Sequence, residues 1–399
     1  MTEMETVDVV VVGGGPSGAT AAADLARAGH SVVLLDRAGR IKPCGGAIPP
    51  RLMKDFAVPD SVLVGHAKSA RMIAPSNRAV DMPIEGGFVG LVDRGDFDEW
   101  LRVRAALAGA RRETGTYEAI ERDPDGTAVV VYRPKGAAKH DALQRLRTRA
   151  VIGADGARSG VARATLKGSE RIPCVFAYHE VIATPTDAAF DRERCDIYYQ
   201  ARLSPDFYAW IFPHGDQTSV GVGSANKGFS LKDATARLRA DTGLTDCVTI
   251  RREGAPIPLK PLKKWDNGRD VVVAGDAAGV VAPASGEGIY YAMTAGREAA
   301  TAVGEFLTTG NPKALAGARK RFMKAHGRVF WILGMMQHFW YSSDKRRERF
   351  VKICDDADVQ RLTWQAYMNK ELVRADPIAH LRIFLKDLGH LFGIGSTAA

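Results

Sequence analysis

The fold of this 399-residue chain is decided by one stretch, Val9-Val10-Val11-Val12-Gly13-Gly14-Gly15-Pro16-Ser17-Gly18. A continuous apolar run such as 9–12 is typical of a parallel strand that is buried on both faces. The alanine-rich residues 19–28 predict a helix that ends at Gly29, and 32–35 predict a second strand. Residues 7–36 are therefore expected to form a βαβ unit whose helix begins at a glycine-rich turn.

This turn has the GxGxxG spacing that accommodates the diphosphate of a dinucleotide. In such a turn Gly13 permits the sharp bend, Gly15 lets a diphosphate approach the backbone, and Gly18 lets helix and strand pack closely. The beginning of the helix offers free N–H groups and a positive dipole end to phosphate. Asp36 ends the second strand, where a carboxylate can accept hydrogen bonds from ribose hydroxyls. An acid there fits FAD or NAD and opposes a ribose 2′-phosphate. The sequence has only one such fingerprint, so NADPH would bind without a Rossmann domain of its own.

Two further segments carry candidate cofactor contacts that are weak when taken singly. Arg94 could reach a phosphate or a ribityl oxygen with its planar guanidinium, although a surface ion pair is the ordinary fate of an arginine. Asp155 follows the apolar residues 150–152, but it belongs to an Asp-Gly pair, which is usually a turn.

The fourth segment begins at the apolar residues 271–273, which predict a buried strand that ends in Gly275-Asp276. Asp276 is placed to accept a hydrogen bond from a ribityl hydroxyl. Gly286 and Gly288 open the next helix, whose N-terminal amides could face the flavin pyrimidine edge, where negative charge collects on reduction.

In this order, the four segments resemble the p-hydroxybenzoate-hydroxylase-like FAD superfamily, with its GxGxxG, DG and GD motifs. The resemblance runs from residue 7 to about residue 300. It implies non-covalent FAD contacted by Ser17, Asp36, Arg94, Asp276, Gly288 and Ile289. The FAD-binding residues that we predict also include Gly13, Gly15, Gly18, Arg37, Asp155, Gly275 and Gly286.

Two other stretches distinguish the chain from the aromatic hydroxylases of that superfamily. Residues 42–49 (KPCGGAIP) follow the adenosine-binding strand, and residues 204–213 (SPDFYAWIFP) have the pattern PxxYxWxFP. With residues 73–78 and 285–291, they resemble the geranylgeranyl reductases of chlorophyll and bacteriochlorophyll biosynthesis over nearly the full length. The hydroxylases usually carry His, Gln and Asn where this chain has Gly279, Glu287 and Tyr290.

The resemblance implies stepwise saturation of the C=C bonds of a geranylgeranyl group to phytyl, on a pigment ester or on geranylgeranyl diphosphate. NADPH would reduce FAD, and the reduced flavin would deliver a hydride while a proton arrives from the other side. Such chemistry needs a dry apolar tunnel, for which broad aromatic side chains are suitable walls. The predicted substrate-binding residues are Tyr208, Trp210, Phe212 and Pro213. Packing of a strand in the sheet core is the alternative role for them.

In the family, the loop at Cys44 contacts FAD, which implies cofactor contacts for Cys44, Gly45 and Ala47. A lone cysteine is otherwise a small buried hydrophobe. Tyr208, Trp210 and Cys44 are the residues that we expect in the catalytic centre. The proton donor is left open between Tyr208, His214 and a flavin-bound water, and a histidine at a strand end is ordinarily a surface residue.

The fold class expected is α/β: a discontinuous Rossmann-type FAD-binding domain, an inserted antiparallel-sheet substrate domain and a helical C-terminal region. The FAD-binding domain is assigned to 1–70, 93–168 and 269–310, the substrate domain to 71–92 and 169–268, and the helical region to 311–399.

The five cysteines are scattered, with no CxxC pair or Cys/His ligand spacing, which predicts a reduced, cytoplasmic protein without a bound metal. Of 55 Lys/Arg and 46 Asp/Glu, residues 311–399 hold 16 and 8, so most of the net charge of +9 lies there. Such a basic region is either an ordinary solvated surface or a peripheral contact with the anionic photosynthetic membrane or a diphosphate. Nucleic acid is not expected as a partner.

Two other functions are compatible with the sequence. One is an FAD-dependent aromatic monooxygenase that uses O2. The other is a non-catalytic flavin-binding assembly factor for pigment complexes that docks through the basic C-terminal region.

Overall fold

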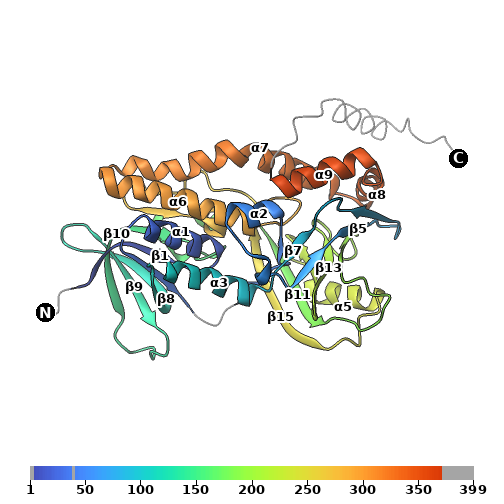
Figure 1. The fold of residues 1–399 in the computed structure, drawn as a ribbon, viewed down its shortest axis with the longest axis horizontal. Helices are drawn as coiled ribbons and strands as arrows, with labels where there is room; N and C mark the ends of the chain where they lie inside the picture. Colours follow the sequence, from blue (N-terminus) through green and yellow to red (C-terminus); the bar gives the residue numbers. More distant parts are fainter. Residues whose placement is uncertain (1–3, 38–40, 371–399) are drawn as a thin grey trace. The chain divides into compact units, whose positions relative to one another are not determined.

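The computed structural model describes residues 4–37 and 41–370, which fall into two compact units (Figure 1). The first unit comprises the described residues up to Lys42, Arg94–Cys174 and Pro256–Gly334. The second comprises Pro43–Asp93, Val175–Ala255 and the described residues from Met335 onward. Both units are therefore discontinuous in sequence.

The first unit is built on a six-stranded sheet in which β8, β2, β1, β10 and β16 run parallel. The fourth of the valines in 9–12 is 2% exposed and the others are fully buried, as a central strand requires. The strand β9 pairs antiparallel with the extensions of β8 and β10. The strands are β1 (Thr6–Val12), β2 (Val32–Asp36), β8 (Arg111–Arg122), β9 (Ala128–Pro134), β10 (Gln144–Gly153) and β16 (Val271–Val273).

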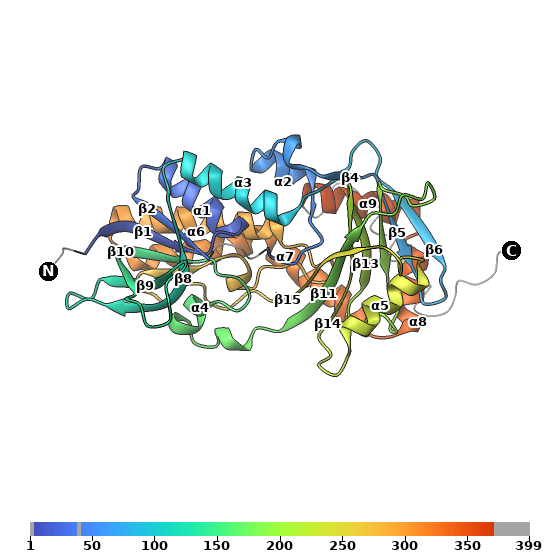
Figure 2. The ribbon, with the colours of Figure 1, turned by 90° about the horizontal axis from the view of Figure 1, so that it is seen from below.

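Helices α1 and α6 of this unit lie against each other (Figures 1 and 2). A Cβ at Gly296 of α6 would lie 2.2 Å from the carbonyl oxygen of Ser17, so the contact requires glycine. The helices are α1 (Pro16–Arg27), α3 (Arg94–Leu107), α4 (Gly160–Thr165), α6 (Ile289–Thr309) and, up to Gly334, α7 (Gly317–Trp340), with 3₁₀ turns η2 (Ser169–Arg171), η3 (Gly275–Ala278) and η4 (Pro312–Ala316). No helix among the described residues is long and apolar enough to cross a membrane.

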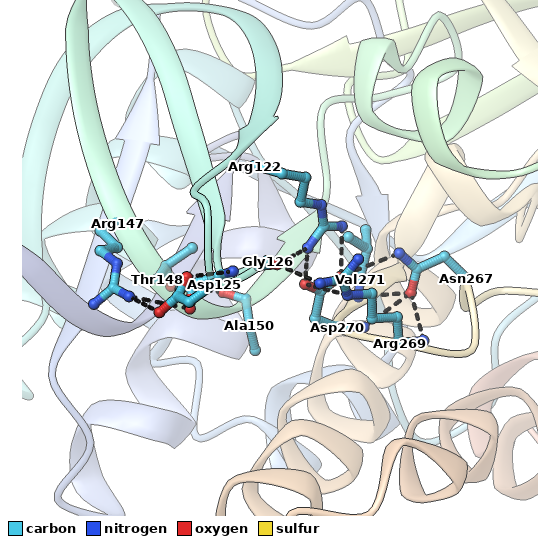
Figure 3. A network of polar contacts seen from close by, with 11 residues as sticks. Arg122, Asp125, Gly126, Arg147, Thr148, Ala150, Asn267, Arg269, Asp270 and Val271 are labelled. Atoms are coloured by element: carbon cyan, nitrogen blue, oxygen red, sulfur yellow. Dashed lines mark hydrogen bonds and ion pairs between the residues drawn. The ribbon is translucent and has the colours of Figure 1, made fainter.

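A polar network holds the chain where β16 begins (Figure 3). Asp270, which is 6% exposed, accepts a hydrogen bond of 2.8 Å from Nη2 of Arg122 on β8. The side-chain oxygen of Asn267 accepts the N–H groups of Arg269, Asp270 and Val271. These bonds satisfy the turn before β16 and so position the GD segment that follows it.

The second unit contains a seven-stranded sheet in the order β15-β11-β14-β13-β12-β5-β6. Helix α5 covers one face, where Ala209, Ile211 and Val220 of the sheet pack with Leu238 of the helix. Neighbours from β11 to β12 are antiparallel, as are β5 and β6, whereas β12 and β5 are parallel. The elements are β5 (Ser69–Ile73), β6 (Ala79–Pro83), β11 (Cys174–Ala183), β12 (Arg194–Tyr198), β13 (Ala209–His214), β14 (Gln217–Ser224), α5 (Leu231–Asp241) and β15 (Thr249–Pro258).

The second unit also includes residues that we had assigned elsewhere from the sequence. Residues 43–70 were expected in the FAD-binding domain, but β3 and β4 pair with β7 in a small sheet of the second unit. Residues 256–268 belong to the first unit, not to the substrate domain, and residues from Met335 onward belong to the second. The elements concerned are β3 (Ala47–Ile48), α2 (Pro50–Asp55), η1 (Asp60–Val62), β4 (Gly65–Ala67), β7 (Val89–Leu91), α8 (Asp344–Ile353) and α9 (Ala357–Asn369).

The tight α1–α6 contact predicts opposite effects for two glycines of α6. Gly296→Ala forces a methyl group onto the backbone of α1 and should lower the free energy of unfolding by about 1–3 kcal/mol. At Gly304 the nearest atom is 3.9 Å away, so Gly304→Ala should raise it by about 0.5–1 kcal/mol. Urea unfolding of the two variants tests this, and equal effects would contradict the steric account.

Candidate active site

The glycine-rich turn of the first unit is closely packed on one side and open on the other. Gly13 has φ +104°, and a Cβ there would lie 2.3 Å from the carbonyl oxygen of Ala154. A Cβ at Gly18 would lie 1.9 Å from the carbonyl oxygen of Gly13. A Cβ at Gly15, in contrast, would meet no described heavy atom within 4 Å beyond its chain neighbours. The turn therefore exposes its backbone at Gly15, where a diphosphate needs to approach.

Ser17 shows that this turn fits a bound anionic group. Its hydroxyl is buried and has no hydrogen-bond partner among the described residues. Gly275 lies beside it, since a Cβ there would be 2.7 Å from Cβ of Ser17. Buried hydroxyls are normally paired, and an unpaired one costs stability. A phosphate oxygen at the N-terminus of α1 would supply the missing partner.

Asp36 lies at the end of β2 with its carboxylate against the same turn. The N–H groups of Gly14 and Arg37 donate to it, yet burial raises its pKa above the usual value. Arg102 of α3, which we did not single out from the sequence, lies 3.7 Å from this carboxylate and donates to the carbonyl oxygen of Gly14. The side chain of Arg37 is exposed. The carboxylate is thus fixed beside the glycine-rich turn.

Asp276 follows β16 in η3 and is buried, with its side chain 5% exposed. It forms an ion pair with Lys42, which belongs to the same stretch of sequence as Cys44. We did not predict a role for Lys42, and its only signal in the sequence was its place in that stretch.

Arg94 and Asp155 already have protein partners. Both carboxylate oxygens of Asp98 accept hydrogen bonds from Arg94, at 2.9 and 2.7 Å, in a buried bidentate pair. Asp155 accepts the N–H groups of Gly160 and Val161 and the hydroxyl of Ser159, and therefore caps α4. These bonds give Asp155 a structural role at the beginning of α4, and its expected contact with FAD stays a prediction.

The loop before α6 places Gly286 at φ +64° and buries Ile289 at the beginning of the helix. Gly288 is the N-cap residue of α6. One oxygen of Glu287 accepts the N–H of Tyr290 at 3.0 Å. One of the amides that we expected to face the flavin is therefore satisfied by the chain itself.

In the second unit, the polar residues of the PxxYxWxFP stretch attach it to β14. Ser204 donates to the carbonyl oxygen of Gly223 at 2.6 Å and accepts the N–H of Phe207 at 2.9 Å. Asp206 accepts the hydroxyl of Ser224 at 2.6 Å. The buried Arg347 of α8 donates to the carbonyl oxygen of Pro205 at 2.5 Å. These contacts position the aromatic residues that follow.

Tyr208, Trp210 and Phe212 form a row, with ring centroids 6.0 and 6.3 Å apart. Because side chains alternate along a strand, Trp210 and Phe212 lie on the face of β13 opposite α5. We call Tyr208, Trp210 and Phe212 the aromatic row. Pro213, which we had grouped with these residues from the sequence, lies with Ile211 on the α5 face, because side chains alternate along the strand. Burial raises the pKa of Tyr208 well above its usual value.

The loop that contains Cys44 rests on the end of this row. Nε2 of His214 lies 3.0 Å from the carbonyl oxygen of Gly45, and a Cβ at Gly45 would be 3.0 Å from the Phe212 ring. His214 is half-buried, unlike the surface residue that we expected, and burial lowers its pKa. The thiol of Cys44 accepts the N–H of Gly46 at 3.4 Å, and Ala47 begins β3. The two stretches that set this chain apart from the hydroxylases therefore meet in the second unit.

Comparison with known proteins agrees with this arrangement. A family model described as an FAD binding domain matches residues 6–324. The chain is thus a flavoprotein of that class. The geranylgeranyl diphosphate reductase of Rhodobacter capsulatus is 58% identical over 97% of this chain and 98% of its own length. The chloroplastic geranylgeranyl diphosphate reductase of Oryza sativa subsp. japonica is 36% identical over 96% of this chain and 86% of its own. The chain belongs to the geranylgeranyl reductase family.

A solved structure shares the fold. The crystal structure of a geranylgeranyl bacteriochlorophyll reductase-like protein from Thermoplasma acidophilum is similar with a TM-score of 0.80 at 23% identity. The similarity covers 94% of this chain and 100% of that chain. At this identity the comparison establishes the fold alone, and it confirms the α/β class predicted from the sequence.

The unpaired hydroxyl of Ser17 gives a prediction with two readouts. Ser17→Ala should weaken FAD binding at least about tenfold, because a hydrogen bond to a charged phosphate is lost. The apoprotein of the variant should be no less stable than wild-type apoprotein, because Ser17 has no hydrogen-bond partner to lose among the described residues. Fluorescence titration with FAD measures the affinity, and thermal unfolding of the apoprotein measures the stability. Unchanged FAD affinity would remove Ser17 from the cofactor site.

Proposed function

We propose that this protein reduces the C=C bonds of a geranylgeranyl group stepwise to phytyl, with FAD as its cofactor and NADPH as electron donor. The observation that carries the proposal is the contact of the aromatic row with the Cys44 loop through Gly45 and His214. These are the stretches by which the chain resembles geranylgeranyl reductases, and the family relationship supports their shared role.

Reduced FAD would supply a hydride, and the protein must then hold the alkene, exclude water and deliver a proton. The aromatic row is suited to the first two tasks, since its rings are broad and rigid, with Trp210 buried and Tyr208 and Phe212 half-buried. Burial raises the pKa of Tyr208, so its phenol is a weaker acid than that of an ordinary tyrosine. We therefore propose that Tyr208 serves mainly as wall, together with Trp210 and Phe212.

The first unit would hold the cofactor. We propose that Ser17 and the open backbone at Gly15 bind the diphosphate, that Asp36 binds the adenosine ribose, and that Asp276 binds a ribityl hydroxyl. Asp276 would exchange its ion pair with Lys42 for that hydrogen bond or share it. The FAD contacts of Arg94 and Cys44 remain part of the same proposal.

The activity can be tested under anaerobic conditions with purified holoprotein, NADPH, and either geranylgeranyl diphosphate or a geranylgeranyl-esterified chlorophyllide. Products that gain two hydrogens for each reduced bond would support the proposal, and comparison of the two substrates shows which form is used. Hydroxylated product formed only in air would favour a monooxygenase. FAD binding without NADPH consumption would favour an assembly factor.

Trp210 tests the assignment of the aromatic row. Trp210→Ala should lower kcat/KM for the geranylgeranyl substrate at least about tenfold, because a large aromatic contact is lost. FAD content, measured by absorbance, should be unchanged. Trp265→Phe, a conservative change of a fully buried tryptophan in the first unit, is the control and should keep its activity. Wild-type kinetics in Trp210→Ala would assign Trp210 to the sheet core.

We further propose a peripheral membrane contact through α7. Lys324, Arg328, Trp331 and Met335 are exposed at spacings of four, three and four residues, so they share one side of the helix. Trp331 is 67% exposed, which is unusual for a tryptophan. Basic residues beside exposed apolar ones suit the surface of an anionic bilayer, where long-tailed substrates reside.

Vesicle sedimentation tests this contact. Binding to anionic vesicles should fall several-fold in Trp331→Ala and in Lys324→Glu/Arg328→Glu, and should weaken as salt rises. Leu107→Ala removes an exposed apolar side chain at the end of α3 and serves as the control. Binding that is equal in all variants would contradict the proposal.

A further inference from the structure

A buried histidine outside the predicted residues lies next to the aromatic row. His179 of β11 is 3% exposed, and a Cβ at Gly221 of β14 would lie 2.6 Å from its Cβ and 2.4 Å from the Trp210 ring. Gly221 pairs directly with both His179 and Trp210 in the sheet. The imidazole and the indole therefore flank one glycine on the face opposite α5.

Hydrogen bonds connect these side chains across four adjacent strands. Nε1 of Trp210 on β13 lies 3.0 Å from the hydroxyl oxygen of Ser219 on β14. Nδ1 of His179 lies 2.8 Å from the same oxygen. Nε2 of His179 lies 2.9 Å from a carboxylate oxygen of Glu253 on β15.

The direction of the bonds follows from what each group can donate. An indole N–H can only donate, so the oxygen of Ser219 accepts from Trp210. The hydroxyl proton of Ser219 is then available to Nδ1 of His179, and Nε2 carries the proton that faces Glu253. Each polar group in this series is satisfied, as a rigid buried network requires.

The carboxylate end of the network is anchored by charge. Nε of Arg251 forms an ion pair with the second oxygen of Glu253 at 3.0 Å, without the geometry of a hydrogen bond. Arg251 also donates to Asp93 at 2.8 Å and to Gln217 at 3.1 Å. Glu253 is therefore held at the edge strand, and the imidazole is held between two fixed partners.

We propose that His179 is a positioning residue that fixes the indole of Trp210 in the aromatic row and thereby sets the affinity for the isoprenoid chain. The proposal rests on the proposed function. It assigns no step of the chemistry to His179, because the network joins the imidazole to the indole of Trp210, and an indole does not relay protons.

The kinetic test separates binding from chemistry. His179→Ala should raise KM for geranylgeranyl diphosphate about five- to tenfold and leave kcat within about twofold, as loss of uniform binding requires. His179→Asn can keep the contact with Ser219 and should recover much of the loss. A fall in kcat at unchanged KM would overturn the positioning role.

Ser219 supplies a second variant with a matched control. Ser219→Ala should raise KM in the wild type but not in Trp210→Phe, because phenylalanine has no N–H to satisfy. Thr218→Val removes a neighbouring buried hydroxyl of β14 that pairs with Thr184, and should leave KM unchanged. An equal effect of Ser219→Ala in both backgrounds would contradict the proposal.

A readout without substrate distinguishes this inference from the proposed function. The indole N–H resonance of Trp210, assigned by its loss in Trp210→Phe, should shift and exchange faster with solvent in Ser219→Ala and His179→Ala. If the resonance responds but the wild type reduces no geranylgeranyl group, the proposed function fails and the network stands. If it does not respond in either variant, the positioning role is wrong whatever the activity.

Discussion

The first unit depends on the close approach of three backbone segments around Ser17. Gly18 packs on Gly13, Gly275 abuts the side chain of Ser17, and Gly296 of α6 touches its carbonyl oxygen. A side chain at Gly275 or Gly296 would separate segments that are far apart in sequence, and one at Gly18 would disrupt the turn itself. Because they approach so closely, the hydroxyl of Ser17 is buried at the N-terminus of a helix and has no hydrogen-bond partner in the part of the chain that the structure describes. The same packing that stabilises the unit thus leaves one anion-binding position unsatisfied.

The second unit uses glycine differently, to make room for aromatic side chains. Gly221 accommodates Trp210, Gly223 accommodates Phe207, and Gly45 lies against Phe212. Polar partners then restrict the freedom of the rings, as Ser219 does for the indole. Such rings present an apolar surface, while their polar atoms are hydrogen-bonded within the sheet. A surface of this kind can exclude water and still be well ordered. This combination suits a substrate that is an isoprenoid chain and offers no polar group along its length.

Much of the fold could be predicted because the relevant signals are local. The βαβ unit, the diphosphate turn, the strand before Asp276 and the aromatic strand all follow from apolar runs and glycine spacing. The domain boundaries were less predictable, since β3 and β4 join the second unit only by pairing with β7. The surroundings of Asp155 and Pro213 could not be predicted from local sequence. Asp155 accepts an N–H group at the beginning of α4, and the two-residue period of β13 places Pro213 on the face opposite Trp210.

By itself, the sequence determined the class of the protein, the position of its glycine-rich turn and the family that its two unusual stretches resemble. Each of these results follows from the spacing of residues within a single short segment. Only the tertiary structure decided that His214 joins those two stretches, and that His179, Ser219 and Glu253 support Trp210 from three other strands. The reason is physical: strand order and register set which side chains meet, and they depend on pairing between residues far apart in the chain.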